Sequence, residues 1–252
     1  MPRRQPARSS WPTVVTVVAI LLLAAALGAG GVFLLARSRT TQLFGRLVAR
    51  VDTPDKVVAL TFDDGPSAAL ADSVMGVLSE RRVHATFFVL GGQLVQLPGA
   101  ARRLVAAGHE LANHSYTHER MVFKSSAFIQ SEIERTDAVI RAAGERGEIY
   151  FRPPYCWKLV GLPLYLKRTA RTTVTWDVEP ESDAKVAANP EAIVEHTLAR
   201  VRPGSIVLLH VWGNRASLVA LPKIIDGLRS QGYDFVTVDE LINRPSGRPG
   251  IS

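Results

Sequence analysis

Charged and titratable side chains recur in this 252-residue sequence at the points where apolar runs end. Such runs suit buried strands, and in parallel α/β folds the working residues lie at the C-terminal ends of the strands. Side chains at such ends meet at one edge of a sheet and can share one reaction. The residues concerned are Asp63 with Asp64, His114, Arg152, Asp177 and His210.

Two adjacent carboxylates close the first of these runs, in the stretch Thr61–Pro66. Successive residues on a strand point to opposite faces and the chain bends at Gly65, so Asp63 and Asp64 need not do the same job. One can hold a metal ion while the other holds a proton. The alternative is a surface turn, because Asp, Gly and Pro are common turn formers.

Two histidines four residues apart, His114 and His118, follow the third predicted strand. In a helical or tightly coiled turn their imidazoles can converge on one ion. With Asp64 or Asp63 as the third ligand they form a triad of two imidazoles and one carboxylate, which leaves coordination positions open for water and substrate. In loops this spacing is more often without a ligand, so the two histidines alone do not decide between these readings.

The stretch Phe151–Tyr155 contains two consecutive prolines, which fix their own φ angles and restrict the residue before them. A loop this stiff can hold Arg152 against a carboxylate and aim a backbone N–H at a developing oxyanion. His210 ends another apolar run. It is either a satisfied structural residue or, in a hydrolytic site, an acid for the leaving group, since its reference pKa is about 6.5.

Strand-like and helical patterns alternate along residues 56–243 and would position these side chains. Regular alternation predicts an α/β fold with a parallel sheet and outer helices, and about seven repeats favour a barrel. The predicted strands are Val57–Phe62, Ala85–Leu90, Glu110–Asn113, Ile149–Phe151, Thr172–Trp176, Ser205–His210 and Phe235–Val238. The predicted helices are Ala69–Arg82, Gly99–Ala107, Ser126–Ala143, Val160–Lys167, Pro190–Arg200, Leu218–Gln231 and a short helix from Asp239.

Four motifs, in this order and spacing, resemble those of the polysaccharide deacetylases of carbohydrate esterase family 4, the NodB-homology domain. They are Thr-Phe-Asp-Asp-Gly-Pro at 61–66, His-Ser-x-x-His at 114–118, Arg-Pro-Pro-Tyr at 152–155 and Leu-Leu-His at 208–210. The resemblance covers residues 56–243. It implies a distorted (β/α) barrel of about seven strands and a metal-dependent hydrolysis that removes acetyl groups from N-acetylated sugars.

The resemblance also implies a role for each motif residue. Asp63 would be the general base, Arg152 would orient it, the Tyr155 backbone N–H would help form the oxyanion hole, and His210 would be the general acid. One divalent metal is implied, zinc first, with cobalt, nickel or manganese as alternatives. Its ligands would be Asp64, His114 and His118. The pocket that receives the acetyl methyl group would be lined by Leu208 and Pro153.

Three positions depart from the family's usual motifs. Cys156 stands where glycine is usual, as a small residue that fits or as a thiol that responds to a nearby metal. Trp212 stands in the segment after His210 where Asp is frequent, and it suits stacking on a sugar ring in the substrate pocket. The family's Asp-Trp pair is absent. The acid that tunes His210 is therefore left open among Asp177, Glu179 and Asp183.

An uncharged apolar stretch over residues 13–36 precedes the linker and the catalytic region. At about 1.5 Å per residue it is long enough to cross a hydrocarbon layer of ~30 Å. We predict a basic segment at 1–12, a single transmembrane signal-anchor at 13–36, a linker at 37–55, a catalytic domain at 56–243 and a flexible tail at 244–252. A cleaved signal peptide is the alternative, because arginines precede the stretch and alanines 24–26 suit a peptidase.

The net charge of +7 does not indicate nucleic-acid binding. Residues 1–50 contain seven arginines and no other charged residue, and removing these seven from the 30 basic residues leaves 23, equal to the 23 acidic ones. The globular part is therefore formally neutral, and no phosphate-binding face follows from composition. The single cysteine excludes an intrachain disulfide.

Three functions are compatible with these features. The first is a single-pass membrane enzyme, or a cleaved secreted form, whose extracytoplasmic domain deacetylates a peptidoglycan-like or chitin-like glycan. The extracytoplasmic orientation of this domain is taken from the resemblance and from the short N-terminal segment. The flanking arginines do not decide it, because their numbers on the two sides of the apolar stretch are nearly balanced. The second is a metal-dependent amidohydrolase for a non-sugar amide, and the third is an inactive, anchored glycan-binding module. The sequence does not indicate an oligomeric state.

Overall fold

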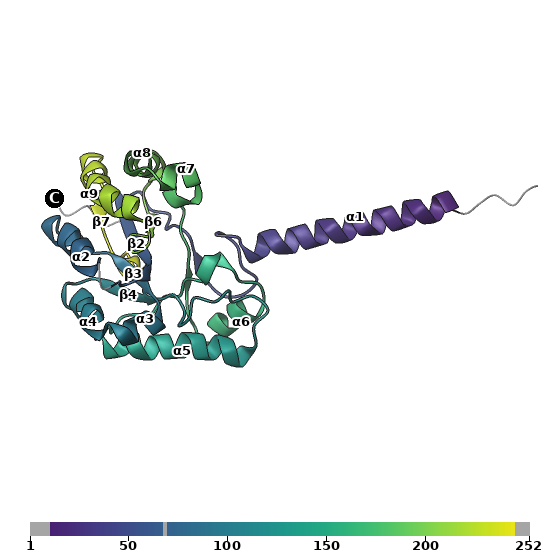
Figure 1. The fold of residues 1–252 in the computed structure, drawn as a ribbon, viewed down its shortest axis with the longest axis horizontal. Coiled ribbons are helices and arrows are strands. Elements are labelled where there is room, and N and C mark those ends of the chain that lie inside the picture. The colour runs from purple at the N-terminus through teal and green to yellow at the C-terminus, as the bar shows by residue number, and fades with distance from the viewer. Residues whose placement is uncertain (1–10, 68–69, 245–252) are drawn as a thin grey trace, which may run out of the picture.

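The computed structural model describes residues 11–67 and 70–244. Most of the predicted basic segment, residues 1–10, and of the predicted tail, residues 245–252, lies outside the described residues. The same holds for residue 69, with which the first predicted helix of the catalytic region begins. The described chain has an α/β fold from which one long N-terminal helix extends (Figure 1).

A parallel sheet forms the centre of the fold, in the order β4-β3-β2-β6 with β7 also paired to β2. Its middle strand is β2 (Val57–Gly65), whose residues are all buried except Asp64. A strand buried on both faces is typical of a parallel sheet covered by helices. The other strands are β3 (Thr86–Val89), β4 (Glu110–Asn113), β6 (Ser205–Leu209) and β7 (Asp234–Phe235). The predicted parallel α/β fold is confirmed.

A second, two-stranded sheet pairs β1 (Leu47–Val48) with β5 (Thr173–Val174). Isolated bridges at Asn113–Phe151 and Phe151–Thr173 connect β4 to β5. In place of the predicted strand Ile149–Phe151, only Phe151 forms bridges to neighbouring strands. The strand cannot continue, because Pro153 and Pro154 follow it and have no N–H group to donate to a neighbouring strand. Closure of the whole barrel stays a prediction.

Helices cover one face of the sheet, where they contribute to a single apolar cluster (Figure 1). Helices α3, α4 and α5 lie toward one edge of this face, and α7, α8 and α9 lie toward the other edge. The bounds are α2 (Ala71–Glu80), α3 (Gly91–Gln96), α4 (Pro98–Ala106), α5 (Ser126–Ala142), α6 (Gly161–Arg168), α7 (Ala184–Ala187), α8 (Pro190–Arg200), α9 (Arg215–Ser230) and α10 (Val238–Ile242). Two of the three apolar clusters of the described residues pack against the sheet, a larger one that includes Phe62 and Leu209 and a smaller one that includes Phe88 and Leu208. The two clusters lie on opposite faces of the sheet, because adjacent strand residues such as Leu208 and Leu209 point to opposite faces.

Helix α8 begins at the predicted cap, since the Asn189 side chain accepts hydrogen bonds from the N–H groups of Glu191 and Ala192. We expect Asn189→Ala to lower the free energy of unfolding by about 1 kcal/mol, because two N–H groups of the first turn lose their acceptor. Urea unfolding of the full chain in detergent measures the change. Asn189→Asp keeps an acceptor and is the control. Equal midpoints for the alanine and aspartate variants would contradict the prediction.

Residues 37–55 differ from the predicted linker, because they pack on the domain. β1 lies within them, and Val48 is buried. The Thr175 hydroxyl donates to the Arg39 carbonyl at 2.6 Å. A two-residue strand is too short to produce a periodic pattern, so the sequence contains no signal for it.

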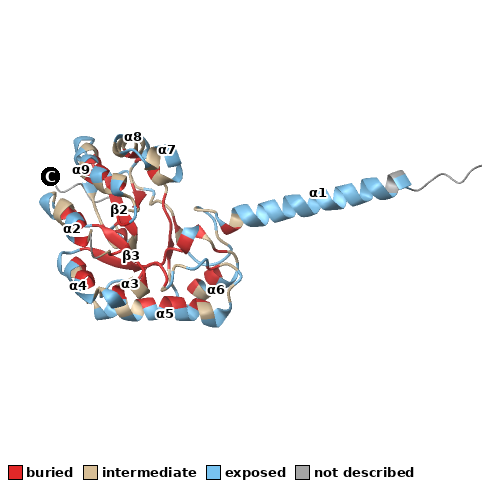
Figure 2. Cartoon of the chain, in the orientation of Figure 1, coloured by how far each residue is buried: buried red, intermediate tan, exposed pale blue. Residues whose placement is uncertain are grey.

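Helix α1 (Trp11–Ala36) contains an apolar segment, Val14–Ala36, whose length and composition suffice to cross a membrane. Its mean hydropathy is 2.6, and none of its most apolar window is buried against the rest of the chain. Figure 2 shows this exposure along the helix, in contrast to the buried strands of the sheet. A signal sequence would meet the same criteria.

Candidate active site

β2 ends in a bulge that changes the direction of its last side chains. The register of β2 against β3 shifts between Asp63 and Gly65, and Asp64 has a positive φ of 67°. A bulge adds one residue to a strand and re-aims its side chains. The alternation expected of a strand is broken here, so Asp63 and Asp64 line the same cavity, whose volume is about 750 Å³.

Asp63 is paired with a fully buried arginine. Arg152 Nη1 donates to Asp63 Oδ1 at 2.7 Å and to Thr61 Oγ1 at 2.9 Å. The other guanidinium nitrogens donate to the carbonyls of Val174 and Thr175 at 3.3 and 3.0 Å. Burial lowers the pKa of Arg152, and the Asp63 carboxylate opposes that shift. With both side chains this constrained, the carboxylate is held in one orientation.

The other aspartate faces two imidazoles. Asp64 Oδ1 lies 3.5 Å from His114 Nε2 and 3.1 Å from His118 Nε2. One ligand atom from each of the three residues lies within 4.8 Å of the other two. Asp64 Oδ1 is buried and accepts no hydrogen bond. Three possible ligand atoms therefore face one another without a hydrogen bond to Asp64 Oδ1, an arrangement that suits a divalent cation.

The hydrogen bonds of His114 support the same use. Its Nδ1 lies 2.8 Å from the Arg152 carbonyl oxygen, which can only accept, so Nδ1 carries the proton and Nε2 has the free electron pair toward Asp64. Burial lowers the pKa of His114 to about 3, which keeps the ring neutral. A neutral imidazole whose second nitrogen is hydrogen-bonded is the form that binds metals.

The loop that presents the two histidines is tightly coiled rather than helical. Ser115 and His118 have φ angles of 72° and 64°, and the Ser115 hydroxyl accepts from the His118 N–H at 3.0 Å. The buried Glu132 of α5 accepts the N–H groups of Tyr116 and Thr117 at 2.9 and 2.8 Å. These bonds give the backbone N–H groups of the turn acceptors although the turn is not helical. The centroid of the His118 ring lies 5.0 Å from that of the His114 ring.

His210 follows β6 and is paired with Glu181, a residue of the short 3-10 turn Pro180–Ser182. Glu181 hydrogen-bonds to His210 Nδ1 and accepts the His210 N–H at 2.9 Å, and the Ser217 hydroxyl donates to it as well. Burial lowers the pKa of His210, but the hydrogen bond to Glu181 and the nearby carboxylates outweigh burial and raise it to about 9. His210 therefore carries a proton at neutral pH.

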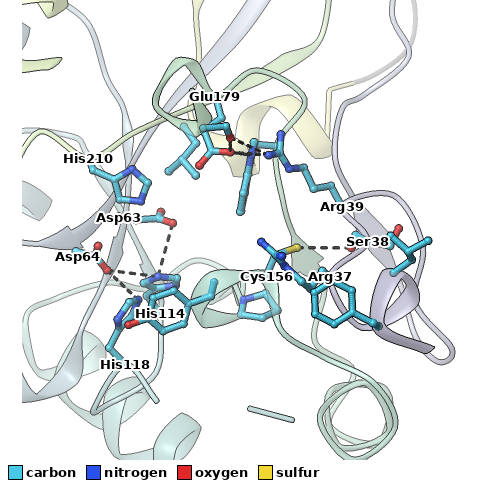
Figure 3. Close-up of a pocket in the computed structure, with 17 residues that line it drawn as sticks. Arg37, Ser38, Arg39, Asp63, Asp64, His114, His118, Cys156, Glu179 and His210 are labelled. Carbon is cyan, nitrogen blue, oxygen red and sulfur yellow. Dashed lines mark hydrogen bonds and ion pairs between the residues drawn. The ribbon is translucent and has the colours of Figure 1, made fainter. Parts of the chain in front are cut away.

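The cavity also brings Tyr155, Pro153 and Leu208 together with these residues. Tyr155, in the turn Pro154–Cys156, has a positive φ of 54°, and its ring lies 4.5 Å from that of His118. Pro153 and Leu208 contribute apolar walls. Figure 3 shows the aspartates and histidines on one side of the cavity, with Arg37, Ser38 and Arg39 facing them from the other. The sequence did not indicate that residues of this N-terminal segment would take part.

Comparisons with known proteins agree with the motifs. A family profile described as polysaccharide deacetylase matches residues 50–168. A peptidoglycan-N-acetylglucosamine deacetylase of Bacillus cereus is 32% identical over 202 residues, which cover 79% of this chain and 93% of that protein. The chain belongs to the polysaccharide deacetylase family. A bifunctional xylanase/deacetylase of Pseudobutyrivibrio xylanivorans is 34% identical over 204 residues, 78% of this chain, but the match spans only 32% of that relative's length.

Among solved structures, a CE4 family pseudoenzyme from Bacillus anthracis superimposes with a TM-score of 0.72 and 26% identity. The superposition covers 81% of this chain and 72% of that one. The polysaccharide deacetylase fold thus extends over the greater part of the chain. Since that neighbour is described as a pseudoenzyme, the fold alone does not establish activity, and the site residues must carry that argument.

The predicted partners of His210 are wrong. Asp177 accepts from the Ser205 hydroxyl and the Ile206 N–H, Glu179 accepts from Trp176 and Arg39, and Asp183 caps α7. Glu181 takes the place beside His210 instead. The reason is local geometry: the turn that begins at Pro180 projects one acid of the segment toward β6. A Pro-Glu-Ser turn within an acidic stretch was the only sequence signal for it.

Trp212 does not line the substrate pocket, contrary to the prediction. It is 9% exposed and packs in the larger apolar cluster, with its ring 6.0 Å from that of Phe87. It also lies against Gly65, where an added Cβ would lie 1.9 Å from the indole nitrogen. The glycine of the Asp-Asp-Gly-Pro motif is therefore required by the close approach of Trp212 to the backbone. Trp176, which the cavity does expose, is the tryptophan of the pocket wall.

Cys156 is a buried residue of the pocket wall with a positive φ of 60°, a conformation that favours the glycine usual in the family. Burial raises the pKa of its thiol, although the ammonium of Lys158 opposes the shift. The thiol therefore stays protonated, as expected of a small residue that fits.

We expect Glu181→Gln to move the alkaline limb of the kcat/KM profile downward by at least about one pH unit. The folded-state pKa of His210, about 9, lies above its unfolded value of 6.5. The protonated form is therefore present at neutral pH and is lost as the pH rises through about 9, and the stability of the pair is lost in the same window. Without the Glu181 charge, burial dominates and the pKa falls. Rates of acetate release from pH 6 to 10 measure the limb.

Glu191→Gln, at an exposed glutamate of α8 paired with Lys223, is the control and should leave the limb in place. An unchanged limb in Glu181→Gln would show that the His210–Glu181 pair does not govern the profile.

Proposed function

We propose that this chain is a metal-dependent N-deacetylase that hydrolyses the acetamide of N-acetylated sugars and releases acetate. One observation carries the proposal: a single cavity is lined by Asp63, which Arg152 holds, by Asp64 with two histidines, and by His210, which is paired with Glu181. Acetamide hydrolysis needs a base, an electrophilic group and an acid around one carbon atom, and these three features supply them.

Asp64, His114 and His118 are the proposed metal ligands. A set of two imidazoles and one carboxylate favours zinc, with cobalt, nickel or manganese as alternatives. When bound, the ion supplies Lewis acidity, which polarises the acetyl carbonyl and makes water more acidic.

Asp63 is the proposed general base. Its Oδ1 is occupied by Arg152, so Oδ2, which lies 3.6 Å from His114 Nε2, is the oxygen free to take a proton from the attacking water. The arginine keeps the carboxylate oriented. Because a base must lie within hydrogen-bond reach of the water, this fixed orientation favours catalysis.

His210 is the proposed general acid. The amine of an amide leaves poorly unless it is protonated, and His210 carries a proton at neutral pH because Glu181 raises its pKa. The backbone N–H of Tyr155 is proposed to stabilise the oxyanion, since the strained turn at Pro154–Cys156 fixes it beside the cavity. Leu208 and Pro153 form the apolar wall proposed to receive the acetyl methyl group.

We further propose that α1 anchors the enzyme in the cell membrane with its catalytic domain outside the cytoplasm. The apolar segment Val14–Ala36 supports the anchor, and the similarity to a peptidoglycan deacetylase supports an envelope glycan, peptidoglycan-like or chitin-like, as the substrate. A cleaved form would lack α1, and mass measurement of the mature protein separates the two cases.

The test is acetate release by the full chain in detergent, with zinc or cobalt and N-acetylglucosamine oligomers or peptidoglycan. Release that disappears with a chelator supports the proposal. Hydrolysis of simple amides alone would point to a non-sugar amidohydrolase, and glycan binding without turnover would point to a binding module. Either result counts against the proposed deacetylation of these glycans.

A further inference from the structure

The end of the apolar helix α1 forms part of the catalytic cavity. Two large apolar residues near the end of α1, Phe33 and Leu34, line the same cavity as the two aspartates. The next residues, Arg37, Ser38 and Arg39, complete that wall (Figure 3). A helix long enough to cross a membrane and a hydrolytic site thus share one cavity.

Specific contacts dock the end of α1 on the domain. Ala36 is 2% exposed, and its carbonyl accepts the Lys158 N–H at 2.8 Å. The Lys158 ammonium donates to the Ser38 carbonyl, and the ring of Phe33 packs edge-on against Trp157 at 5.4 Å. These contacts join α1 to the segment that follows the Arg-Pro-Pro-Tyr motif. The cavity therefore keeps its place at the end of the helix.

The surface around this junction is apolar and exposed. Tyr155 is 53% exposed and Val160 is 49% exposed, on either side of the Lys158 contact with α1. Phe123 is 88% exposed. The turn that contains Phe123 and Lys124 lies beside the turn at Val160 and Gly161, because an added Cβ on Gly161 would lie 3.8 Å from the Lys124 carbonyl oxygen. Aromatic and apolar residues exposed beside the end of a membrane helix are typical of the bilayer interface.

Two cations without carboxylate partners lie at the same junction. Arg37 stacks on Phe33 and Trp157 at 5.4 and 5.7 Å, and Arg120 stacks on the same Trp157 ring at 5.6 Å. In the described part of the chain neither forms an ion pair, whereas Arg39 pairs with Glu179 at 2.7 Å. Arg37 lines the cavity, so an anion carried by the substrate would meet an available guanidinium there.

We propose that the substrate is an N-acetylated sugar carried on a membrane lipid through a phosphate or diphosphate group. The inference rests on the proposed deacetylase function and on α1 as an anchor. The sugar acetamide lies between Asp63 and His210, the phosphate lies at Arg37, and the lipid chain follows Phe33 and Leu34 into the bilayer. Water cleaves the C–N bond to give acetate and the free amine, and the phosphate link is unchanged.

The test is a competition in nanodiscs that contain the full chain. The two probes are N-acetylglucosamine on a polyprenyl diphosphate in the bilayer and soluble N-acetylglucosamine oligomers, and the ratio of deacetylated products gives the ratio of their kcat/KM values. We expect a preference of at least about tenfold for the lipid-linked probe. A monophosphate-linked probe in a parallel reaction identifies the anion.

Arg37→Ala is expected to reduce that preference at least about fivefold, mainly through KM, because it removes the cation that meets the phosphate. Arg102→Ala, at an exposed arginine of α4, is the matched control and should keep the preference. Equal kcat/KM values for lipid-linked and soluble probes would overturn the inference and leave the deacetylase standing. Acetate from neither probe would overturn the deacetylase itself.

A measurement that needs no turnover checks the placement of the cavity. Brominated lipids quench the fluorescence of tryptophans at the bilayer surface, so part of the quenching in nanodiscs should come from Trp157, which contacts α1. That part should be missing in Trp157→Phe. It should be retained in Trp212→Phe, because the indole of Trp212 in the wild type is buried in the core and away from the lipid. Equal quenching in wild type and Trp157→Phe would place the cavity away from the membrane and overturn the inference.

Discussion

His114→Ala is expected to lower the affinity of the full chain for zinc by at least about 100-fold. Mutation of a residue that only hydrogen-bonds to a metal ligand can already cost about that much affinity. His114 is buried, and its Nε2 is aimed at Asp64 by the hydrogen bond from Nδ1 to the Arg152 carbonyl. Alanine removes one of three ligand atoms and leaves Asp64 with one imidazole. Competition with a chromophoric chelator measures the affinity without any need for turnover.

His196→Ala, on the surface of α8, is the matched control and should bind zinc as the wild type does. A thermal scan of the apo protein separates loss of the ligand from loss of the fold. Wild-type affinity in a folded His114→Ala variant would remove Asp64, His114 and His118 as the metal site, whatever the enzyme does.

Asp63→Asn is expected to reduce kcat by about 10²- to 10⁴-fold, the usual contribution of a general base, while zinc affinity changes little. Asparagine keeps the volume of the side chain and an oxygen for Arg152, but it cannot take a proton. Because Asp64 and not Asp63 is the proposed ligand, turnover and metal affinity should separate in this variant. Acetate release and chelator competition on one preparation measure both.

Asp72→Asn is the control, since Asp72 is an exposed carboxylate on α2 that pairs with Arg103. It should retain wild-type turnover. If Asp63→Asn kept more than about a tenth of the activity, the base would have to be another group. If it lost zinc as well, the two aspartates would have been assigned the wrong way round.

Sequence patterns predicted the central strands well because each is a short apolar run with a clear end. Glu110–Asn113 and the helix Pro190–Arg200 have the predicted bounds, and β2 extends three residues beyond its prediction, through the Asp-Asp-Gly bulge. Elements of two residues, such as β1, were missed because no periodicity can develop over so short a length. The predicted strand next to Pro153 and Pro154 was too long, since the ladder there loses its donors.

The chemical groups at the strand ends could be predicted from the sequence, because strand ends and turn residues are local properties of the chain. The sequence therefore identified the aspartates, the histidine pair, Arg152 and His210 as one constellation. The three-dimensional fold was needed to show that Glu181, rather than its neighbours, contacts His210, and that Trp212 packs against Gly65 instead of a sugar. It also placed the end of α1 in the wall of the catalytic cavity. These outcomes depend on contacts between residues far apart in the chain. Turns and packing set the directions of the side chains concerned, and they leave no periodic pattern in the sequence.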